Sequence, residues 1–496
     1  MSTKPSRPAG KSSGCSGKSW IQPGSSGFTS SAATSERKGD AMEETRTLAA
    51  FCAGLSYESL PAPVVEKAKL CVLDFLANVY GSFELDAFSA LVPLFRDRRG
   101  VEIATAIGCG FKTGLRDAAF LNGTAAEAIE AQDGLRFGGN HPGVAVIPAA
   151  LAVAEETAAG GRAFLEAVVA GYEAANRIAA SVHPRHTLSG FLPTGTCGTF
   201  GAACAAARLM GLNATGTLGA LGNAGYLAPF SMAEQLMGGH PIKIVQGGQA
   251  AACGILAADL ARAGIQGSPD VLEGSALKGG FLQITTGGQA APERLTDRLG
   301  EHFTLLDVYL KPYTSCRHTH GAAQAVLALV KEEDVRPETI EGIDVYTYGI
   351  GALAVGKGVS REDTFVSAQF SIPYVVACCV MDREMGPAQL RRARLRDPAL
   401  LDFCGKVSVR YDEELNKLYP DKTATRVEIR LKGGGTRVRQ VDTPRGDPRD
   451  PMTPEDVAEK LKRFARGRNP EQLEETVRLV LRLEEVSNIR SLTALL

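Results

Sequence analysis

The feature that most constrains this chain is a series of Ala- and Gly-rich segments in which apolar residues recur at helical spacing. Gly or Asn separates the segments, and Gly is common just beyond the end of a helix. Small side chains also let helices pack closely. The pattern therefore predicts a helical core, with helices at residues 63–80, 143–158, 162–180, 195–210, 214–226 and 245–263.

A different pattern begins near residue 305, where β-branched runs alternate apolar with polar residues. Such alternation is typical of strands with one wetted face. Pro373 is expected to interrupt a helix-like segment at 365–381, and Thr453 with Pro454 to begin a last helical region. Strands are predicted at 343–348, 407–411 and 426–431, with a hairpin through Lys432-Gly-Gly-Gly435 to 436–441.

The length of 496 residues exceeds what one hydrophobic core usually organises, so two domains are expected. Residues 42–305 are predicted to be all-helical and residues 306–449 to form a smaller α+β domain, after which residues 450–496 are helical again. Residues 1–41 are rich in Ser, Gly and Lys, and are expected to be a disordered tail.

Composition argues against several classes of protein. Lys+Arg number 54 and Asp+Glu 55, so no global charge favours nucleic acid or anionic lipid. We find no uninterrupted apolar stretch of membrane-spanning length and no secretory signal. The 11 Cys lack disulfide-framework or cluster spacing, which favours reduced thiols and a cytoplasmic location. No membrane or nucleic-acid partner is therefore expected.

One segment gathers groups that can exchange protons. Thr124 and Glu127 have capping-box spacing, which predicts a helix from Thr124 toward Asp133. Glu130 and Asp133 would end this helix, and His141 follows in a Gly-rich loop. Acid and base could converge there. The alternative is that both carboxylates lie on a solvated helix face and pair with Arg136.

Lys243 lies between Gly-rich turns, directly before an Ala-rich helix that should be buried. It could hold a substrate carboxylate or, if desolvated, lose its proton and act as a base. The alternative is an exposed lysine. Six of the seven His lie in predicted loops, where they would be accessible. The pairs His183/His186 and His318/His320 lack further ligands at metal-site spacing, so no metal is expected.

Five motifs together resemble the MmgE/PrpD family. They are Leu73-Asp-Phe-Leu-Ala-Asn-Val-Tyr-Gly, Asn122-Gly-Thr-Ala-Ala-Glu-Ala, His141-Pro-Gly, Lys311-Pro-Tyr-Thr-Ser-Cys-Arg-His-Thr-His320 and Gln369-Phe-Ser-Ile-Pro-Tyr374. The resemblance implies a mostly α fold, with a large all-helical domain (42–305 and 450–496), a smaller α+β lid domain (306–449), a site between them and a homodimer. It also implies chemistry without a metal or organic cofactor.

The resemblance further implies which residues form the site. The catalytic candidates are Asp133, His141, Lys243, His320 and Tyr374. Glu130, Arg317 and His318 are the candidates for substrate binding. Lysine and arginine can hold carboxylates and absorb developing enediolate charge, while His and Tyr can move protons.

The expected reaction is proton abstraction alpha to a carboxylate of a small polycarboxylic acid, with dehydration or hydration as for 2-methylcitrate. Alternatives are epimerisation of an iminodisuccinate-like dicarboxylate, decarboxylation of cis-aconitate, and binding without catalysis. The chain has Leu192 where the decarboxylases have a His, and its acidic residues before His141-Pro have a different spacing. Because leucine cannot transfer protons, this departure disfavours decarboxylation.

Overall fold

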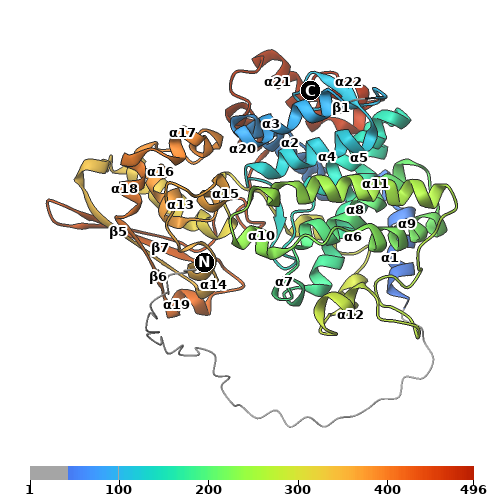
Figure 1. Ribbon diagram of the computed structural model, residues 1–496, viewed down its shortest axis with the longest axis horizontal. Coiled ribbons are helices and arrows are strands. Elements are labelled where there is room, and N and C mark those ends of the chain that lie inside the picture. The colour runs from blue at the N-terminus through green and yellow to red at the C-terminus, as the bar shows by residue number, and fades with distance from the viewer. Residues whose placement is uncertain (1–42, 99) are drawn as a thin grey trace, which may run out of the picture. The chain divides into compact units, whose positions relative to one another are not determined.

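The computed structural model describes residues 43–98 and 100–496, and residues 43–496 form one compact unit. Helices dominate, and four of the eight strands in the described residues belong to one small sheet (Figure 1). The predicted mostly α fold with a smaller α+β part is confirmed. The division into a helical domain and a lid remains a prediction, and the predicted tail at 1–41 lies outside the described residues.

The core consists of helices that pack against one another around α8 and α11. Small residues permit this packing: a Cβ on Gly201 in α8 would lie 2.5 Å from the carbonyl oxygen of Gly171 in α6. The predicted helices at 143–158, 162–180, 195–210, 214–226 and 245–263 are confirmed to within two residues at each end. The core helices are α4 (Leu115–Ala128), α5 (Gly143–Thr157), α6 (Gly161–Val182), α8 (Pro193–Leu209), α9 (Ala214–Leu227) and α11 (Gln246–Arg262).

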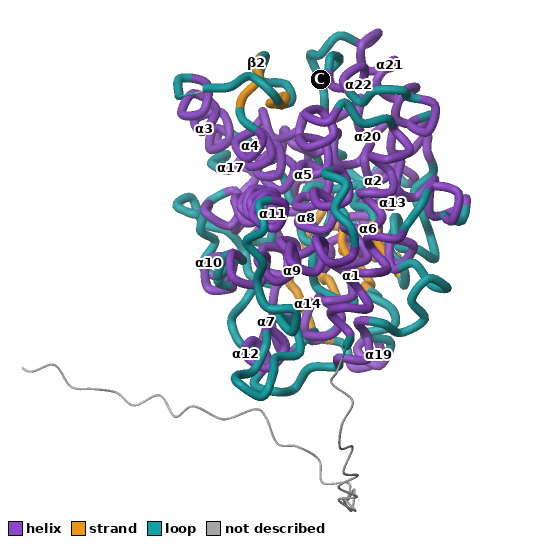
Figure 2. Tube along the Cα trace, turned by 90° about the vertical axis from the view of Figure 1, so that its right-hand side faces the viewer, coloured by secondary structure: helices purple, strands orange, loops and turns teal. Residues whose placement is uncertain are grey.

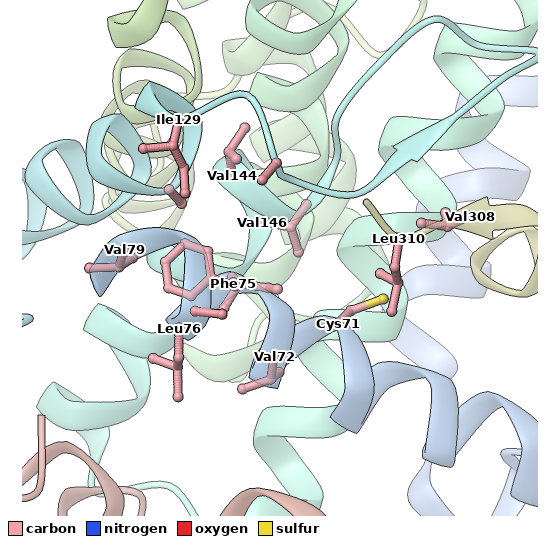
Figure 3. Close-up of a cluster of buried hydrophobic side chains, with 14 of the residues drawn as sticks. Cys71, Val72, Phe75, Leu76, Val79, Ile129, Val144, Val146, Val308 and Leu310 are labelled. Atoms are coloured by element: carbon pink, nitrogen blue, oxygen red, sulfur yellow. The ribbon is translucent and has the colours of Figure 1, made fainter. Parts of the chain in front are cut away.

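Helix α2 (Ala62–Gly81), near the start of the described chain, packs against α20 (Pro454–Phe464), near its end. Apolar side chains of α2 meet Val144 and Val146 of α5 in a buried cluster (Figure 3). Thr453 caps α20 through the N–H of Asp456, as predicted. The other helices around this core are α1 (Glu44–Gly54), α3 (Asp86–Arg96), α7 (Arg185–Leu188), α10 (Ala233–Met237), α12 (Phe281–Thr286), α21 (Pro470–Leu481) and α22 (Arg490–Thr493).

The main sheet has the strand order β6-β5-β7-β8. Strand β5 (Ile340–Thr347) is parallel to β6 (Val407–Tyr411) and antiparallel to β7 (Thr425–Leu431), which continues into β8 (Thr436–Val441) as the predicted hairpin. Helices α13 (His320–Glu332) and α16 (Ile372–Met381) pack against the sheet. Shorter helices in this region are α14 (Gly349–Val355), α15 (Phe365–Gln369), α17 (Arg392–Leu395), α18 (Pro398–Cys404) and α19 (Glu413–Lys417).

Two pairs of very short strands lie among the helices (strands are orange in Figure 2). One pair is β1 (Ala104–Ala106) with β2 (Phe111–Thr113). The other is β3 (Gly134–Leu135) with β4 (Val308–Tyr309), in which Gly134 pairs with Tyr309. This second pair brings the loop after α4 beside the chain that leads into Lys311.

Two boundaries differ from the prediction. Thr124 does not begin a helix, because α4 starts at Leu115 and ends at Ala128, before the two acidic residues. The capping-box spacing was fortuitous, since Thr124 and Glu127 are both buried inside a longer helix. In the segment 365–381 the break precedes Pro373: Ser371 caps α16, and proline fits its first turn.

One helical stretch within the described residues, Pro241–Arg262, is long and apolar enough to cross a membrane by length and composition. It is 61% buried and comprises a short 3₁₀ turn, η3 (Pro241–Val245), followed by α11. Because α11 packs against α4, α5, α8 and α9, its composition is that of a core helix.

Candidate active site

The centre of the site is the carboxylate of Glu130, which lies between two lysines. Lys311 donates to Glu130 Oε1 at 2.8 Å, and Lys243 donates to Glu130 Oε2. The three side chains are buried, with 0%, 3% and 2% of the surface of Lys311, Lys243 and Glu130 exposed. Three charged groups from distant parts of the chain therefore meet away from water.

Local structure explains this meeting. Glu130 follows the end of α4 and has a left-handed backbone, φ 55°, which turns the chain sharply. Lys243 is in η3 and Lys311 follows β4, whose pairing with β3 fixes it beside the loop. The neighbouring residues Ile129 and Leu310 are buried in the apolar cluster (Figure 3). The site therefore has an apolar wall, which strengthens its electrostatic interactions.

A second carboxylate, Glu127, lies on the other side of Lys243, with Oε1 3.2 Å from the lysine Nζ. It also accepts from Gln246 Nε2 at 2.5 Å and from the backbone N–H of Gly247 at 2.8 Å. Burial opposes charge on all these groups, and it raises the pKa of Glu127. The two lysines nevertheless hold the pKa of Glu130 well below its usual range, and the glutamates raise that of Lys243.

The direction of its pKa shift favours Lys243 as a group that holds a substrate carboxylate over Lys243 as a base. A lysine that acts as a base at neutral pH needs a lowered pKa. Burial alone would lower it, but Glu130 and Glu127 outweigh burial, so Lys243 is an ammonium group. The reading of Lys243 as an exposed lysine is also wrong, since it is 5% exposed.

His141 faces this cluster from the loop before α5. Its Nδ1 lies 2.5 Å from the carbonyl oxygen of Asp133, and its Nε2 lies 3.9 Å from Glu130 Oε1. Burial and the two lysines lower the pKa of His141 to about 3, so it is neutral at pH 7. A carbonyl can only accept, so Nδ1 carries the hydrogen and Nε2 presents a lone pair toward the cluster.

Asp133 supports this loop with both carboxylate oxygens. Oδ2 accepts from Tyr172 at 2.6 Å, and Oδ1 accepts from the N–H of Gly143 at 3.1 Å. Burial raises the pKa of Asp133 to about 6. The close approach requires glycine, because a Cβ on Gly143 would lie 2.6 Å from Tyr172 Oη and 2.9 Å from Asp133 Oδ1.

The solvated arrangement of Glu130 and Asp133 is wrong. Both are at most 3% exposed and lie beyond the end of α4. Arg136 pairs with neither of them. Its guanidinium donates to the carbonyl of Asp421 at 2.6 Å and lies 3.6 Å from Asp447.

Three other predicted residues, Arg317, His318 and His320, lie beyond Lys311 on the same segment and have partners of their own. Arg317 donates to the carbonyl oxygens of Arg445 and Pro444 at 2.8 and 2.7 Å. His318 Nδ1 is 2.6 Å from Tyr348 Oη, and His320 Nε2 is 3.1 Å from the carbonyl of Ser315. Burial lowers the pKa of His318 to about 4 and holds the pKa of His320 well below its usual range.

The expectation that loop histidines are accessible is therefore wrong for His320, which begins α13 and is fully buried, and for His186, which is 1% exposed. Tyr374 is also fully buried, and its hydroxyl donates to the carbonyl of Gln389 at 2.5 Å. None of the contacts described for Tyr374 joins it to Glu130, Lys243 or His141.

Sequence reasoning missed two central residues, Lys311 and Glu127. Both stand inside motifs that carried the family resemblance, which was the available signal. Lys311 was overlooked because no pattern shows that β4 pairs with β3. Glu127 was assigned only a capping role.

Leu192 is the N-cap residue of α8, and its N–H donates to the carbonyl of Ser231 at 2.7 Å. Two residues later, Thr194 accepts from the backbone N–H of His141 at 3.0 Å. Leu192, which departs from the decarboxylase pattern, therefore lies at the N-terminal end of α8, and α8 contacts the site through Thr194. Within the described residues, no group of three or more His, Cys, Asp or Glu could hold a metal.

Comparison with known proteins identifies two family models and several relatives. The MmgE/PrpD N-terminal domain matches residues 46–293, and the MmgE/PrpD C-terminal domain matches residues 313–485. A cis-aconitate decarboxylase of Aspergillus terreus (strain NIH 2624 / FGSC A1156) is 27% identical over 472 residues, which are 91% of this chain and 95% of the relative. The Homo sapiens cis-aconitate decarboxylase is 28% identical over 397 residues, 76% of this chain and 79% of the relative.

Proposed function

Because this chain belongs to the MmgE/PrpD family, we propose that it is a lyase that removes a proton alpha to a carboxylate of a small polycarboxylic acid. The observation that carries the proposal is the buried pair of ammonium groups, Lys243 and Lys311, on one carboxylate. A site that holds the carboxylate of Glu130 in this way has the donors to hold a substrate carboxylate.

Lys243 and Lys311 would stabilise the reaction through charge. Loss of an alpha proton moves negative charge onto the adjacent carboxylate, which becomes an enediolate. Ammonium groups fixed in an apolar surrounding stabilise that developing charge without having to reorient. This chemistry can proceed on the chain's own side chains, which supports a reaction without a metal or organic cofactor.

His141 is the proposed base. Its Nε2 lone pair faces the cluster, and the carbonyl of Asp133 fixes the tautomer. The low pKa of His141 is caused by burial and by the lysines. A bound polycarboxylate would bring negative charge that raises this pKa toward the range in which imidazole accepts a proton.

Substrate entry requires movement around Lys243. The ring of Phe370 lies over its ammonium group, 5.9 Å from Nζ to the ring centroid. Thr364 Oγ1 donates to the carbonyl of Gly239 at 2.5 Å. Both contacts join the segment predicted as a lid to the chain around Lys243. Separation of these contacts would open the site.

Two reactions fit this machinery. Dehydration or hydration of a 2-methylcitrate-like hydroxy acid needs the alpha proton and loss of hydroxide from the beta carbon. Decarboxylation of a cis-aconitate-like acid is supported by the relatives named cis-aconitate decarboxylase: carbon dioxide would leave one carboxylate, the lysines would stabilise the electron pair left on carbon, and a proton would then be added there. Leu192 supports dehydration as the first candidate, because this position lacks the His of the decarboxylase pattern.

Products distinguish these reactions. The purified protein would be incubated separately with 2-methylcitrate, citrate, cis-aconitate and an iminodisuccinate-like dicarboxylate. Dehydration gives a conjugated alkene that absorbs in the ultraviolet and releases no gas, whereas decarboxylation gives carbon dioxide. Inversion at the alpha carbon without either product would mean an epimerase, and binding without turnover would contradict the proposed lyase.

We also propose that the protein is a cytoplasmic homodimer. Large apolar side chains are exposed at 51–91% of their surface near α9 and α10: Tyr226, Phe230, Met232, Met237 and Ile242. Exposed apolar groups close together often mark protein interfaces. The near-zero net charge supports a partner of the same kind rather than nucleic acid.

A further inference from the structure

The loop that carries Glu130 is held by its backbone carbonyls. Three side chains from remote segments donate to carbonyls at the end of α4 and in the loop that follows: Gln369 to Ala128 O at 2.8 Å, Lys311 to Glu130 O at 3.2 Å, and Lys460 to Ala131 O at 2.7 Å. His141 meets the carbonyl of Asp133 in the same loop. The position of Glu130 therefore depends on residues far away in sequence.

Lys460 is the most distant of these donors, 329 residues from Ala131. It projects from α20 and is 2% exposed. Its ammonium group also donates to Asp74 Oδ1 of α2 at 2.6 Å, and Asp74 Oδ2 accepts from Asn78 at 3.0 Å. The Lys460–Asp74 pair thus ties α20, α2 and the Glu130 loop together.

Stability alone does not account for this pair. Removing two charges from water costs so much that a well-packed apolar pair of the same size is often as stable. An apolar pair in place of Lys460 and Asp74 could not donate the hydrogen bond that Lys460 makes to the carbonyl of Ala131.

We propose that Lys460 is a positioning residue for the proposed catalytic site. Glu130 has a left-handed backbone, which is strained for a residue other than glycine and persists only when the surroundings enforce it. Lys311 and Lys460 hold the carbonyls of Glu130 and Ala131, which belong to the two peptide groups on either side of the Ala131 α-carbon. Without Lys460 the Ala131 peptide can rotate, and the Glu130 carboxylate leaves the two lysines.

The test compares two double variants of the full chain with the same net charge. Asp74→Asn/Lys460→Met removes both charges and the donor to Ala131, whereas Asp74→Asn/Lys460→Gln keeps an N–H donor. Lys462→Met, on the exposed side of the same helix, is the matched control. Hydrogen–deuterium exchange followed by mass spectrometry would report on the peptide that covers residues 128–135.

If Lys460 positions the loop, this peptide should exchange at least tenfold faster in the Met double variant than in the wild type. The Gln double variant should show partial rescue, and Lys462→Met should show no change. Exchange in α5 and α8 should stay as in the wild type. Equal exchange of the loop in the Met and Gln variants, or a Met variant like the wild type, would overturn the proposal. If the Met double variant does not fold, Asp74→Asn/Lys460→Leu, which also lacks a donor to Ala131, takes its place, and loop exchange equal to that of the Gln double variant would overturn the proposal.

The catalytic part of this inference rests on the proposed lyase function. If the protein has that activity, kcat of the Met variant should fall at least tenfold more than kcat of the Gln variant, because Glu130 no longer organises the lysines. Exchange of the loop is measured without substrate. If no lyase activity is found, the exchange measurement still tests whether Lys460 positions the loop. The missing activity would count against the proposed function alone.

Discussion

Lys243 is the residue whose surroundings say most about the site. Its ammonium group has two carboxylate partners, Glu127 and Glu130, and almost no contact with water. A buried charge is tolerated when it is paired and hydrogen-bonded. The two carboxylates offset the cost of removing the ammonium group from water. The site therefore holds a fixed positive group that does not titrate near pH 7.

Replacing Lys243 by Met should therefore harm both stability and activity. Breaking a buried ion pair on one side leaves uncompensated carboxylates and costs about 3–5 kcal/mol. Loss of one preorganised donor typically lowers kcat by about 10²–10³-fold. Urea unfolding and turnover would be measured beside Lys278→Met, an exposed lysine that should change neither. A fully active Lys243→Met protein would refute its role.

His141 should remain neutral across the physiological range. Its pKa in the folded protein is about 3, below the value near 6.5 of an unfolded chain. The unfolded state therefore binds more protons between pH 3 and 6.5, and the contribution of His141 to stability, complete above pH 6.5, is lost as pH falls through this window.

Nitrogen NMR of histidine-labelled protein would test this, with His141→Gln used for assignment. No titration of the His141 signals between pH 5 and 8 is expected in the unliganded protein. A midpoint near 6.5 would mean that the site is wetter and less positive than described. The Gln variant should also lose less stability than the wild type between pH 6.5 and 4.

Site residues could be predicted from the sequence most directly where a motif keeps them close together. Glu130, Asp133 and His141 fall within one short segment, and the structure brings them together. Lys243 was identified from its place before a buried helix. Lys311 was not, because its contact with Glu130 depends on the pairing of β3 with β4.

At the scale of elements, periodicity predicted the helices and strands well but not every helix end. The apolar pattern fixes the core face of α5, α6 and α11, and the β-branched runs fix β5 and β7. A cap motif is weaker, because Thr124 has the right spacing yet is buried within α4. Burial by neighbouring helices overrode the local preference of that residue.

The start of α5 provides a test of close packing. Gly143→Ala would place a Cβ within 3 Å of both Tyr172 Oη and Asp133 Oδ1, and these buried groups cannot move freely. We expect a loss of about 1–3 kcal/mol, as for overpacked cores, together with reduced activity. Thermal unfolding would be compared with Gly54→Ala, where a Cβ meets nothing within 4 Å and stability should hold or rise. Equal stability of the two variants would contradict the described packing.

At the scale of the whole molecule, the site depends on both ends of the described chain. Helix α20 packs against α2, and Lys460 reaches the Glu130 loop from it. From Thr453 and Pro454 the sequence predicts where this helix begins, but not which helix it packs against. Contacts across more than 300 residues leave no trace in a local pattern.

The proposed homodimer also belongs to this scale. Light scattering coupled to gel filtration should give twice the chain mass of 52.3 kDa at micromolar concentration. Charges introduced by Phe230→Glu and Met237→Glu should shift the protein to the monomer, because both side chains are exposed apolar groups. A wild-type monomer would contradict the proposal, and a dimer unaffected by both changes would place the interface elsewhere.

In the proposed reaction, two buried lysines activate a proton beside a substrate carboxylate. The most direct measurement is deuterium uptake from deuterium oxide at the alpha carbon of the acid that the protein turns over, followed by proton NMR. We expect deuterium uptake by the wild type, at least a hundredfold slower uptake by Lys243→Met and by Lys311→Met, and wild-type uptake by Lys278→Met. Turnover without any dependence on Lys243 and Lys311 would contradict it.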